Sequence, residues 1–162
     1  MNTVISKFEQ LTSFLNHLKQ IDDETFYAPI GDGKWSTAAI VAHFHYWDQI
    51  IIEERLPDML NGDTLPSFNE RIHLINKDAE QFSKTIPKHT LLNKAIISRL
   101  KLAEKLHTSN LSASFQLDNH SYSLLQYIEE LCTHDERHVK EVASFLYSSY
   151  IGESIHSLQM KP

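Results

Sequence analysis

Apolar residues recur at steps of three and four along most of this chain, which is the period of an amphipathic helix. The first such stretch places these residues on one helical face: Val4, Ile5, Phe8, Leu11, Leu15, Leu18 and Ile21. Glycine and proline, on which sheets and tight hairpins depend for their turns, number only 4 and 5 among 162 residues. The sequence therefore predicts an all-α fold of long helices joined by few loops.

Breaks in this periodicity divide the chain into predicted helices. They cover residues 2–21, 37–59, 68–85, 90–107 and 124–147, whereas 22–35 and 112–121 are expected to be loops, the second with a short extended piece at most. Ser36 or Thr37 is suited to cap the second helix, and Ser121 or Ser123 the last. We expect one helical-bundle domain over residues 1–150 and a C-terminal tail over 151–162.

The charge and cysteine content argue against several functions. The net charge is −6 and lysine and arginine are scattered, so no basic patch is available for a nucleic acid or an anionic membrane. No apolar run is long enough to span a bilayer, and the first residues lack a signal-peptide pattern. The single cysteine, Cys132, fits a reducing compartment. We therefore expect a cytoplasmic protein.

Two histidines on the last predicted helix, His134 and His138, are spaced i, i+4 and so lie on one face. The same stripe carries Tyr127 and Val142, which indicates that it faces the bundle interior. His43 lies on a similar apolar stripe of the second helix. Three inward imidazoles could bind one divalent metal ion and leave a position open for water or substrate. The alternative is that each is a core histidine satisfied by hydrogen bonds.

The other histidines are less suited to a metal site. His45 points away from His43 and is expected at the surface or behind a ligand. His120 lies in a loop that could overhang the site. The remaining histidines lie on polar faces or helix ends and are expected to be solvated: His17, His73, His89, His107 and His156.

Three further side chains near these histidines each have two candidate roles. Asp48 and Glu130 could orient a ligand imidazole through its second nitrogen, or be solvated charges. Cys132 could pair with a histidine as a nucleophile, but it lies on a different face from His134. We expect Cys132 to fill a small apolar space instead.

Two short motifs resemble those of DinB-like proteins. Trp35 and Ser36 open the second helix with His43 eight residues after the tryptophan, and His134-Asp135-Glu136-Arg137-His138 gives H-x-x-x-H on the last helix. The stretch over residues 115–124 is similar to the strand-like segment that precedes the last helix in that family. The resemblance extends from the first helix to about residue 147.

The resemblance implies a four-helix bundle with one extra inserted helix, and a divalent metal ion, zinc or nickel, on His43, His134 and His138. Some DinB-like proteins are thiol S-transferases or isomerases that use low-molecular-weight thiols. Coordination would lower the pKa of such a thiol, so that thiolate forms near neutral pH. We therefore expect a metal-dependent thiol S-transferase, or a related hydrolase or isomerase, with an open three-histidine site and a small-molecule substrate.

Other functions are compatible with the same residues. His134-Asp135-x-x-His138 is close to the zincin motif, in which glutamate stands in place of Asp135 and acts as general base. His134 and Asp135 also match the dyad of a His-Asp phosphohydrolase. A third alternative is a metal-stabilised binding or stress-response module without catalysis. The apolar helix surface in excess of one core also predicts a homodimer.

Overall fold

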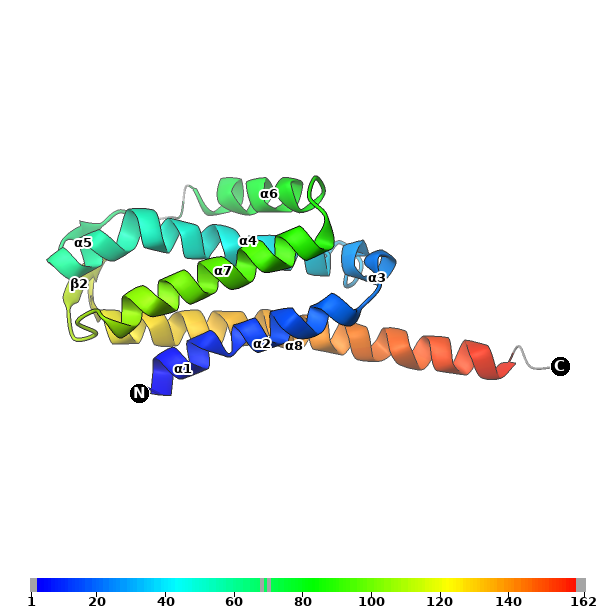
Figure 1. The fold of residues 1–162 in the computed structure, drawn as a ribbon. Coiled ribbons are helices and arrows are strands. Elements are labelled where there is room, and N and C mark those ends of the chain that lie inside the picture. Colours follow the sequence, from blue (N-terminus) through cyan, green and yellow to red (C-terminus); the bar gives the residue numbers. More distant parts are fainter. Residues whose placement is uncertain (1–2, 68, 70, 160–162) are drawn as a thin grey trace.

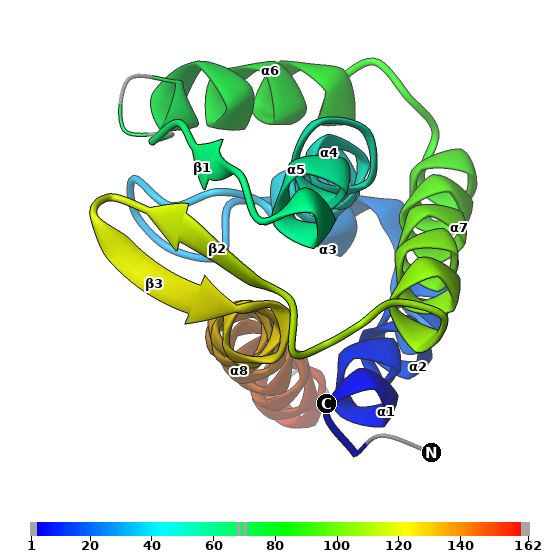
Figure 2. The same cartoon turned by 90° about the vertical axis from the view of Figure 1, so that its left-hand side faces the viewer.

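Four helical segments lie side by side and form the bundle (Figure 1). The computed structural model describes residues 3–67, 69 and 71–159 of the protein. The four segments are α1 with α2 (Thr3–Glu9 and Leu11–His17), α4 (Thr37–Ile50), α7 (Lys88–His107) and α8 (Leu124–Gln159). A further helix, α6 (Ile72–Ser83), packs on the outer side of α4, while α1 contacts α7 and α8 (Figure 2). The predicted all-α bundle with one inserted helix is confirmed.

The first predicted helix is divided, and a short helix follows where a loop was predicted. α1 and α2 separate at Gln10, and a 3₁₀ turn over Leu18–Gln20 follows α2. Asp22 then accepts a hydrogen bond from the backbone nitrogen of Thr25 at 2.7 Å and caps α3 (Asp23–Tyr27). The prediction of a loop here is wrong, because the acidic run that ends one helix also begins the next. Residue 2, the predicted start, lies outside the described residues.

The second predicted helix is continuous but changes its winding. Ser36 Oγ accepts a hydrogen bond from the backbone nitrogen of Ala39 at 3.1 Å, which confirms one of the two predicted caps. Every residue from Thr37 to Phe44 is buried, so α4 is the central helix of the bundle. A π-helical turn over Ile51–Arg55 leads into α5 (Leu56–Asn61), which ends at Gly62 with φ 78°.

A small sheet occupies the stretch that was predicted as a loop or short extended piece. β2 (Ser114–Leu117) and β3 (His120–Ser123) pair antiparallel, and β1 (Thr64–Leu65) pairs parallel with β2. Asp118 and Asn119 turn the hairpin with φ of 50° and 63°, as residues that tolerate the left-handed region do. Ser123 then caps α8, because its Oγ accepts a hydrogen bond from the backbone nitrogen of Gln126. In return, Oε1 of Gln126 accepts a hydrogen bond from the backbone nitrogen of Ser123.

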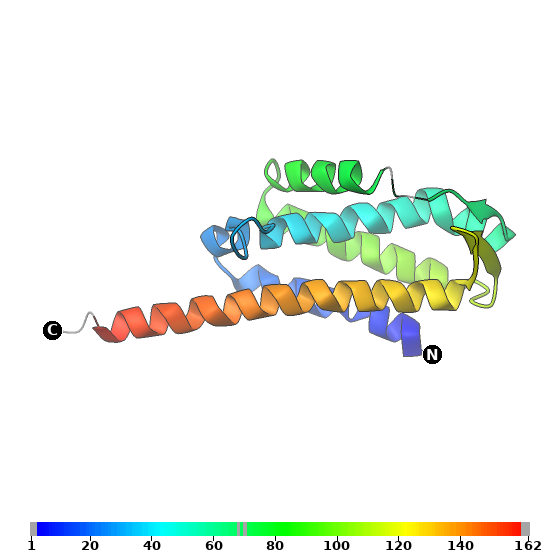
Figure 3. The ribbon, with the colours of Figure 1, turned by 180° about the vertical axis from the view of Figure 1, so that it is seen from behind.

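The remaining helices agree with the prediction except at the C-terminus. α6 confirms the helix predicted at 68–85, of which residues 68 and 70 lie outside the described residues, and α7 confirms the helix predicted at 90–107. α8 passes the predicted end near residue 147 and projects beyond the bundle to Gln159 (Figure 3). One glycine, at 152, costs about 1 kcal/mol in a helix and does not end this one. The division of the chain at residue 150 stays a prediction.

Although α8 spans 36 residues, neither it nor any other helix in the described ranges is long and apolar enough to cross a membrane.

Candidate metal centre

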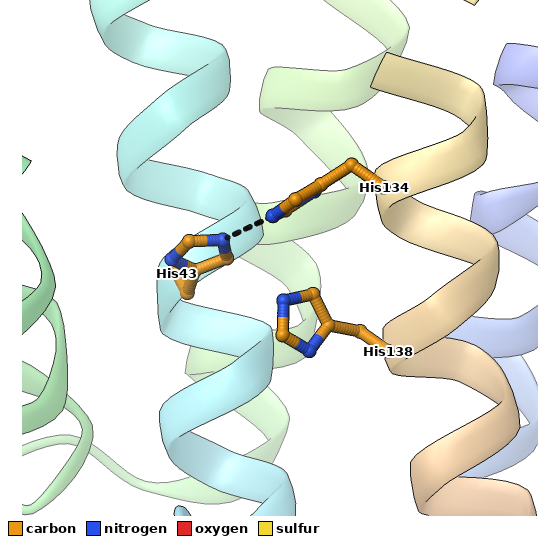
Figure 4. A group of neighbouring side chains, drawn as sticks. All are labelled: His43, His134 and His138. Carbon is orange, nitrogen blue, oxygen red and sulfur yellow. Dashed lines mark hydrogen bonds between the residues drawn. The ribbon is translucent and has the colours of Figure 1, made fainter. Parts of the chain in front are cut away.

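The structure brings together the three histidines that the sequence singles out. His43 lies in the middle of α4, and His134 and His138 lie one turn apart on α8, opposite it (Figure 4). One ring nitrogen from each lies within 4.8 Å of the other two. The Nε2 atoms of His43 and His134 are 3.3 Å apart. His43 is 4% exposed, whereas the other two are half-buried, so the cluster is reached from one side.

Each of these imidazoles has its Nδ1 atom hydrogen-bonded to an oxygen. The pairs are His43 with Asn76 Oδ1 at 3.0 Å, His134 with Asp135 Oδ1 at 3.2 Å, and His138 with Glu141 Oε2 at 3.1 Å. The orientation of the Asn76 amide follows from Trp47, whose indole nitrogen can only donate and lies 3.2 Å from the same oxygen. Because all three partners are acceptors, each Nδ1 carries the ring proton and each Nε2 carries the lone pair.

This arrangement of nitrogens fits a metal ion. Lone pairs that face one another at 3.3 Å, as on His43 and His134, repel unless a cation lies between them. Nitrogens bound at 2.0–2.1 Å in tetrahedral geometry lie about 3.3 Å from one another. The donor set and its spacing therefore suit one divalent ion of the kind that imidazole binds.

The surroundings of His43 and His138 disfavour the protonated form of these two imidazoles. Burial, together with the rings of His134 and His138, lowers the pKa of His43 to about 3. Burial and the neighbouring His134 also lower the pKa of His138. A neutral ring is needed for coordination, because protonated Nε2 has no lone pair to donate.

Aromatic side chains surround the cluster. The centroid of the Trp35 ring lies 5.3 Å from that of His43, and the ring stacks against His138 at 6.4 Å. Phe44 packs edge-on against His138 at 5.9 Å, and Trp47 against His43 at 6.1 Å. These contacts hold the imidazoles in place and keep water from part of the cluster.

A buried ionic network lies behind His134. Arg99 on α7 contacts Asp48 on α4 through Nε at 3.0 Å, and Asp135 on α8 through Nη1 at 2.6 Å. Burial raises the pKa of Asp48 to about 6, against the attraction of Arg99. Burial acts in the same direction on Asp135, but Arg99 and the hydrogen bond from His134 outweigh it and hold the pKa of Asp135 below its usual value. Two carboxylates thus share one guanidinium beside a histidine of the cluster.

The structure corrects the roles considered for Asp48 and His120. Asp48 is neither solvated nor in contact with an imidazole, because it is buried against Arg99. His120 does not overhang the cluster: it is exposed on β3, where its Nδ1 contacts the backbone oxygen of Asp118 at 2.9 Å. Glu130 is exposed and lines the same cavity as the three histidines.

The other candidates lie away from the cluster. His45 is half-buried and contacts Ser98 Oγ at 3.0 Å, rather than supporting a ligand. Cys132 is buried in a cluster of apolar core residues, which confirms the apolar role predicted for it, and burial raises the pKa of its thiol to about 11. The histidines expected in solvent are exposed: His17, His73, His89 and His107. The side chain of His156 lies outside what the structure describes.

Sequence reasoning missed three residues that support the cluster. Glu141 lies three residues after His138 on the same helix, so its contact was visible as an i, i+3 pair. Asn76 and Arg99 gave no such signal, because each lies on a helix that carries no histidine of the cluster. Their contacts depend on how α6 and α7 pack against α4 and α8.

The three histidines line a cavity of about 530 Å³ that is bounded by residues of α4, α6, α7 and α8. Within the described part of the chain, no fourth histidine, cysteine or carboxylate joins the cluster. A fourth coordination position would therefore face the cavity, where a small molecule has room to reach it.

Comparison with known proteins supports the fold. No protein-family model matches the sequence, and no curated protein matches it significantly. The structure is similar to that of YfiT from Bacillus subtilis, a probable metal-dependent hydrolase with an unusual four-helix bundle topology. The two superpose with a TM-score of 0.70 over 92% of this chain and 86% of YfiT, at 18% sequence identity. The chain therefore has the four-helix bundle fold of YfiT, as its resemblance to DinB-like proteins predicts.

Proposed function

We propose that His43, His134 and His138 bind one divalent metal ion, zinc or nickel, and that the protein uses it to act on a small molecule. One observation carries this proposal: all three Nδ1 atoms are engaged by acceptors while one nitrogen from each ring converges at the wall of a cavity. Three protein ligands with an open position are typical of catalytic sites, whereas structural sites take a fourth protein ligand.

The reaction we propose is metal-dependent thiol S-transfer, with hydrolysis as the second candidate. A bound ion lowers the pKa of a thiol or water at its open position, so that the nucleophile forms near neutral pH. The protein orients the three imidazoles through hydrogen bonds from their Nδ1 atoms to Asn76, Asp135 and Glu141. The similarity to YfiT, itself a probable metal-dependent hydrolase, is the support for the second candidate.

Two alternatives fit the contacts less well. Asp135 is held by Arg99 and by His134, which does not suit the free general base of a zincin. A non-catalytic module with a metal that only stabilises the fold needs a closed coordination shell. The cluster of described residues supplies three ligands, so the catalytic function is the better supported one.

Metal content tests the ligand set. Protein purified without a nickel-affinity tag should carry one equivalent of zinc or nickel, and His43→Ala should lose it. His17→Ala and His89→Ala are matched controls, because both histidines are exposed away from the cavity. If His17→Ala stripped the metal as fully as His43→Ala, the assignment would be wrong.

Cobalt substitution tests whether the site is open. In Cys132→Ser protein, which has no other thiol, 2-mercaptoethanol should add an intense near-ultraviolet charge-transfer band and release a proton. If the cobalt protein already shows the strong visible absorption of a four-coordinate tetrahedral ion, and millimolar thiol does not change the spectrum, the site is closed. The non-catalytic module would then be the better proposal.

The homodimer predicted from the sequence stays a prediction. Ile97 and Leu100 on α7 are 53% and 48% exposed, and such apolar side chains suit a contact between two copies. Sedimentation of wild type and an Ile97→Glu/Leu100→Glu double variant tests it, since only the variant should remain monomeric.

A further inference from the structure

The walls of the cavity differ in chemistry from its metal-binding corner. Next to the three histidines stand the rings of Trp35, Phe44 and Trp47. The lining also includes aliphatic side chains, among them Ile51 from the π-helical turn and Leu131 from α8. A molecule held at the corner would therefore extend its body over apolar and aromatic surface.

The charged groups of the lining offer little to a ligand. Asp48, Arg99 and Asp135 are buried and already contact one another, so their charges are engaged within the protein. Glu130 and Arg137, both exposed on α8, carry opposite charges and together favour neither an anion nor a cation. Specificity for a ligand body thus rests on the apolar lining.

The size of the cavity exceeds what a water or a minimal thiol requires. Its volume is about 530 Å³, whereas an apolar cavity of about 150 Å³ is enough to hold benzene. A hydroxyl-rich body would lose hydrogen bonds to water against these walls, and each group left unpaired would weaken its binding. An aromatic or branched aliphatic body has no such groups to lose.

We infer that the open metal position takes a thiol, or another donor group, that carries an aromatic or branched aliphatic body rather than a hydroxyl-rich one. This inference rests on the proposed metal site and adds the class of molecule that the site accepts.

Two thiols of similar acidity test the inference in cobalt-loaded Cys132→Ser protein. Phenylmethanethiol and 2-mercaptoethanol present the same donor with different bodies, and the charge-transfer band reports direct binding of each. We expect phenylmethanethiol to half-saturate the band at a concentration at least tenfold lower than 2-mercaptoethanol does. A factor of ten equals about 1.4 kcal/mol, which burial of about 60 Å² of apolar surface provides.

A matched pair of variants on α6 locates the body. Ile72 is 38% exposed and lines the cavity, whereas Leu74 is 54% exposed and does not. Ile72→Asn should raise the half-saturating concentration of phenylmethanethiol severalfold and leave that of 2-mercaptoethanol unchanged, and Leu74→Asn should change neither.

The outcomes separate this inference from the proposed function. Equal half-saturation by the two thiols, or an Ile72→Asn effect that is the same for both, would overturn the inference and leave the open metal site standing. If neither thiol produced a thiolate band, the proposed open metal site itself would be contradicted.

Discussion

The amide oxygen of Asn76 lies 3.0 Å from Nδ1 of His43, although 33 residues separate the two in the chain. Asn76 belongs to α6, the helix that is inserted into the four-helix arrangement. Since the same oxygen accepts the indole hydrogen of Trp47, it faces His43 as an acceptor and selects the Nδ1–H tautomer. The inserted helix therefore determines which nitrogen of His43 is presented to the cavity.

Asn76→Ala should weaken metal binding without unfolding the protein. Loss of the acceptor frees the His43 ring to rotate and to exchange tautomers, and removal of such a partner typically costs 10–100-fold in metal affinity. Competition with a coloured chelator measures this affinity. Gln81→Ala is the matched control, because Gln81 is exposed on the same helix and does not line the cavity. Equal affinities of the two variants would show that Asn76 plays no part.

Arg99→Met should be strongly destabilising. The substitution leaves the carboxylates of Asp48 and Asp135 buried without their shared cation, and breaking a buried ion pair in this way costs about 3–5 kcal/mol. Urea denaturation of the metal-free protein measures the loss.

Asp48→Asn is the informative comparison for Arg99→Met. It leaves Arg99 paired with Asp135 alone, so its effect on the free energy of unfolding should be much smaller. Were Asp48→Asn to destabilise the protein as much as Arg99→Met, the sharing of one guanidinium by two carboxylates would not describe the network.

Much of the fold follows from local sequence signals. The period of the apolar residues placed α4, α6 and α7 correctly, and Ser36 and Ser123 marked two helix starts through their side-chain caps. The hairpin was only partly visible, because strands of four residues show little alternation. The acidic segment at Asp22 was misjudged because one residue type both ends and begins helices.

The metal centre likewise contains some contacts that the sequence predicts and others that it does not. His134 and His138 are related by helix geometry alone, and His43 by its apolar stripe, so the sequence could propose that they meet. The contact between Arg99 and Asp135 depends on the packing of two helices and has no counterpart in spacing along the chain. Asp48 was considered as a partner for an imidazole, but the guanidinium of Arg99 engages it instead.

The metal-free protein should lose stability in acid through His43. Its pKa of about 3 in the folded state lies below its ordinary value of 6.5, so the unfolded chain binds the extra proton between these limits. Stability is therefore retained above pH 6.5 and falls as the pH drops toward 3. From pH 6.5 to 5, the free energy of unfolding of wild type should fall by about 1.5 kcal/mol more than that of His43→Gln. Parallel pH profiles would rule out this contribution.

Trp35→Ala should affect both stability and the metal site. The indole is half-buried and lies against the rings of His43 and His138, at the point where the chain enters α4. Truncating a fully buried tryptophan costs about 3–5 kcal/mol, so we expect about 2 kcal/mol for this ring. Metal affinity should also fall, because the two imidazoles lose the surface that restricts their rotation. Tyr147→Ala, at a site that is 70% exposed, should leave the melting temperature and the affinity unchanged. If the melting temperature of Trp35→Ala were close to that of wild type, the indole ring would stabilise neither the start of α4 nor the buried position of His43.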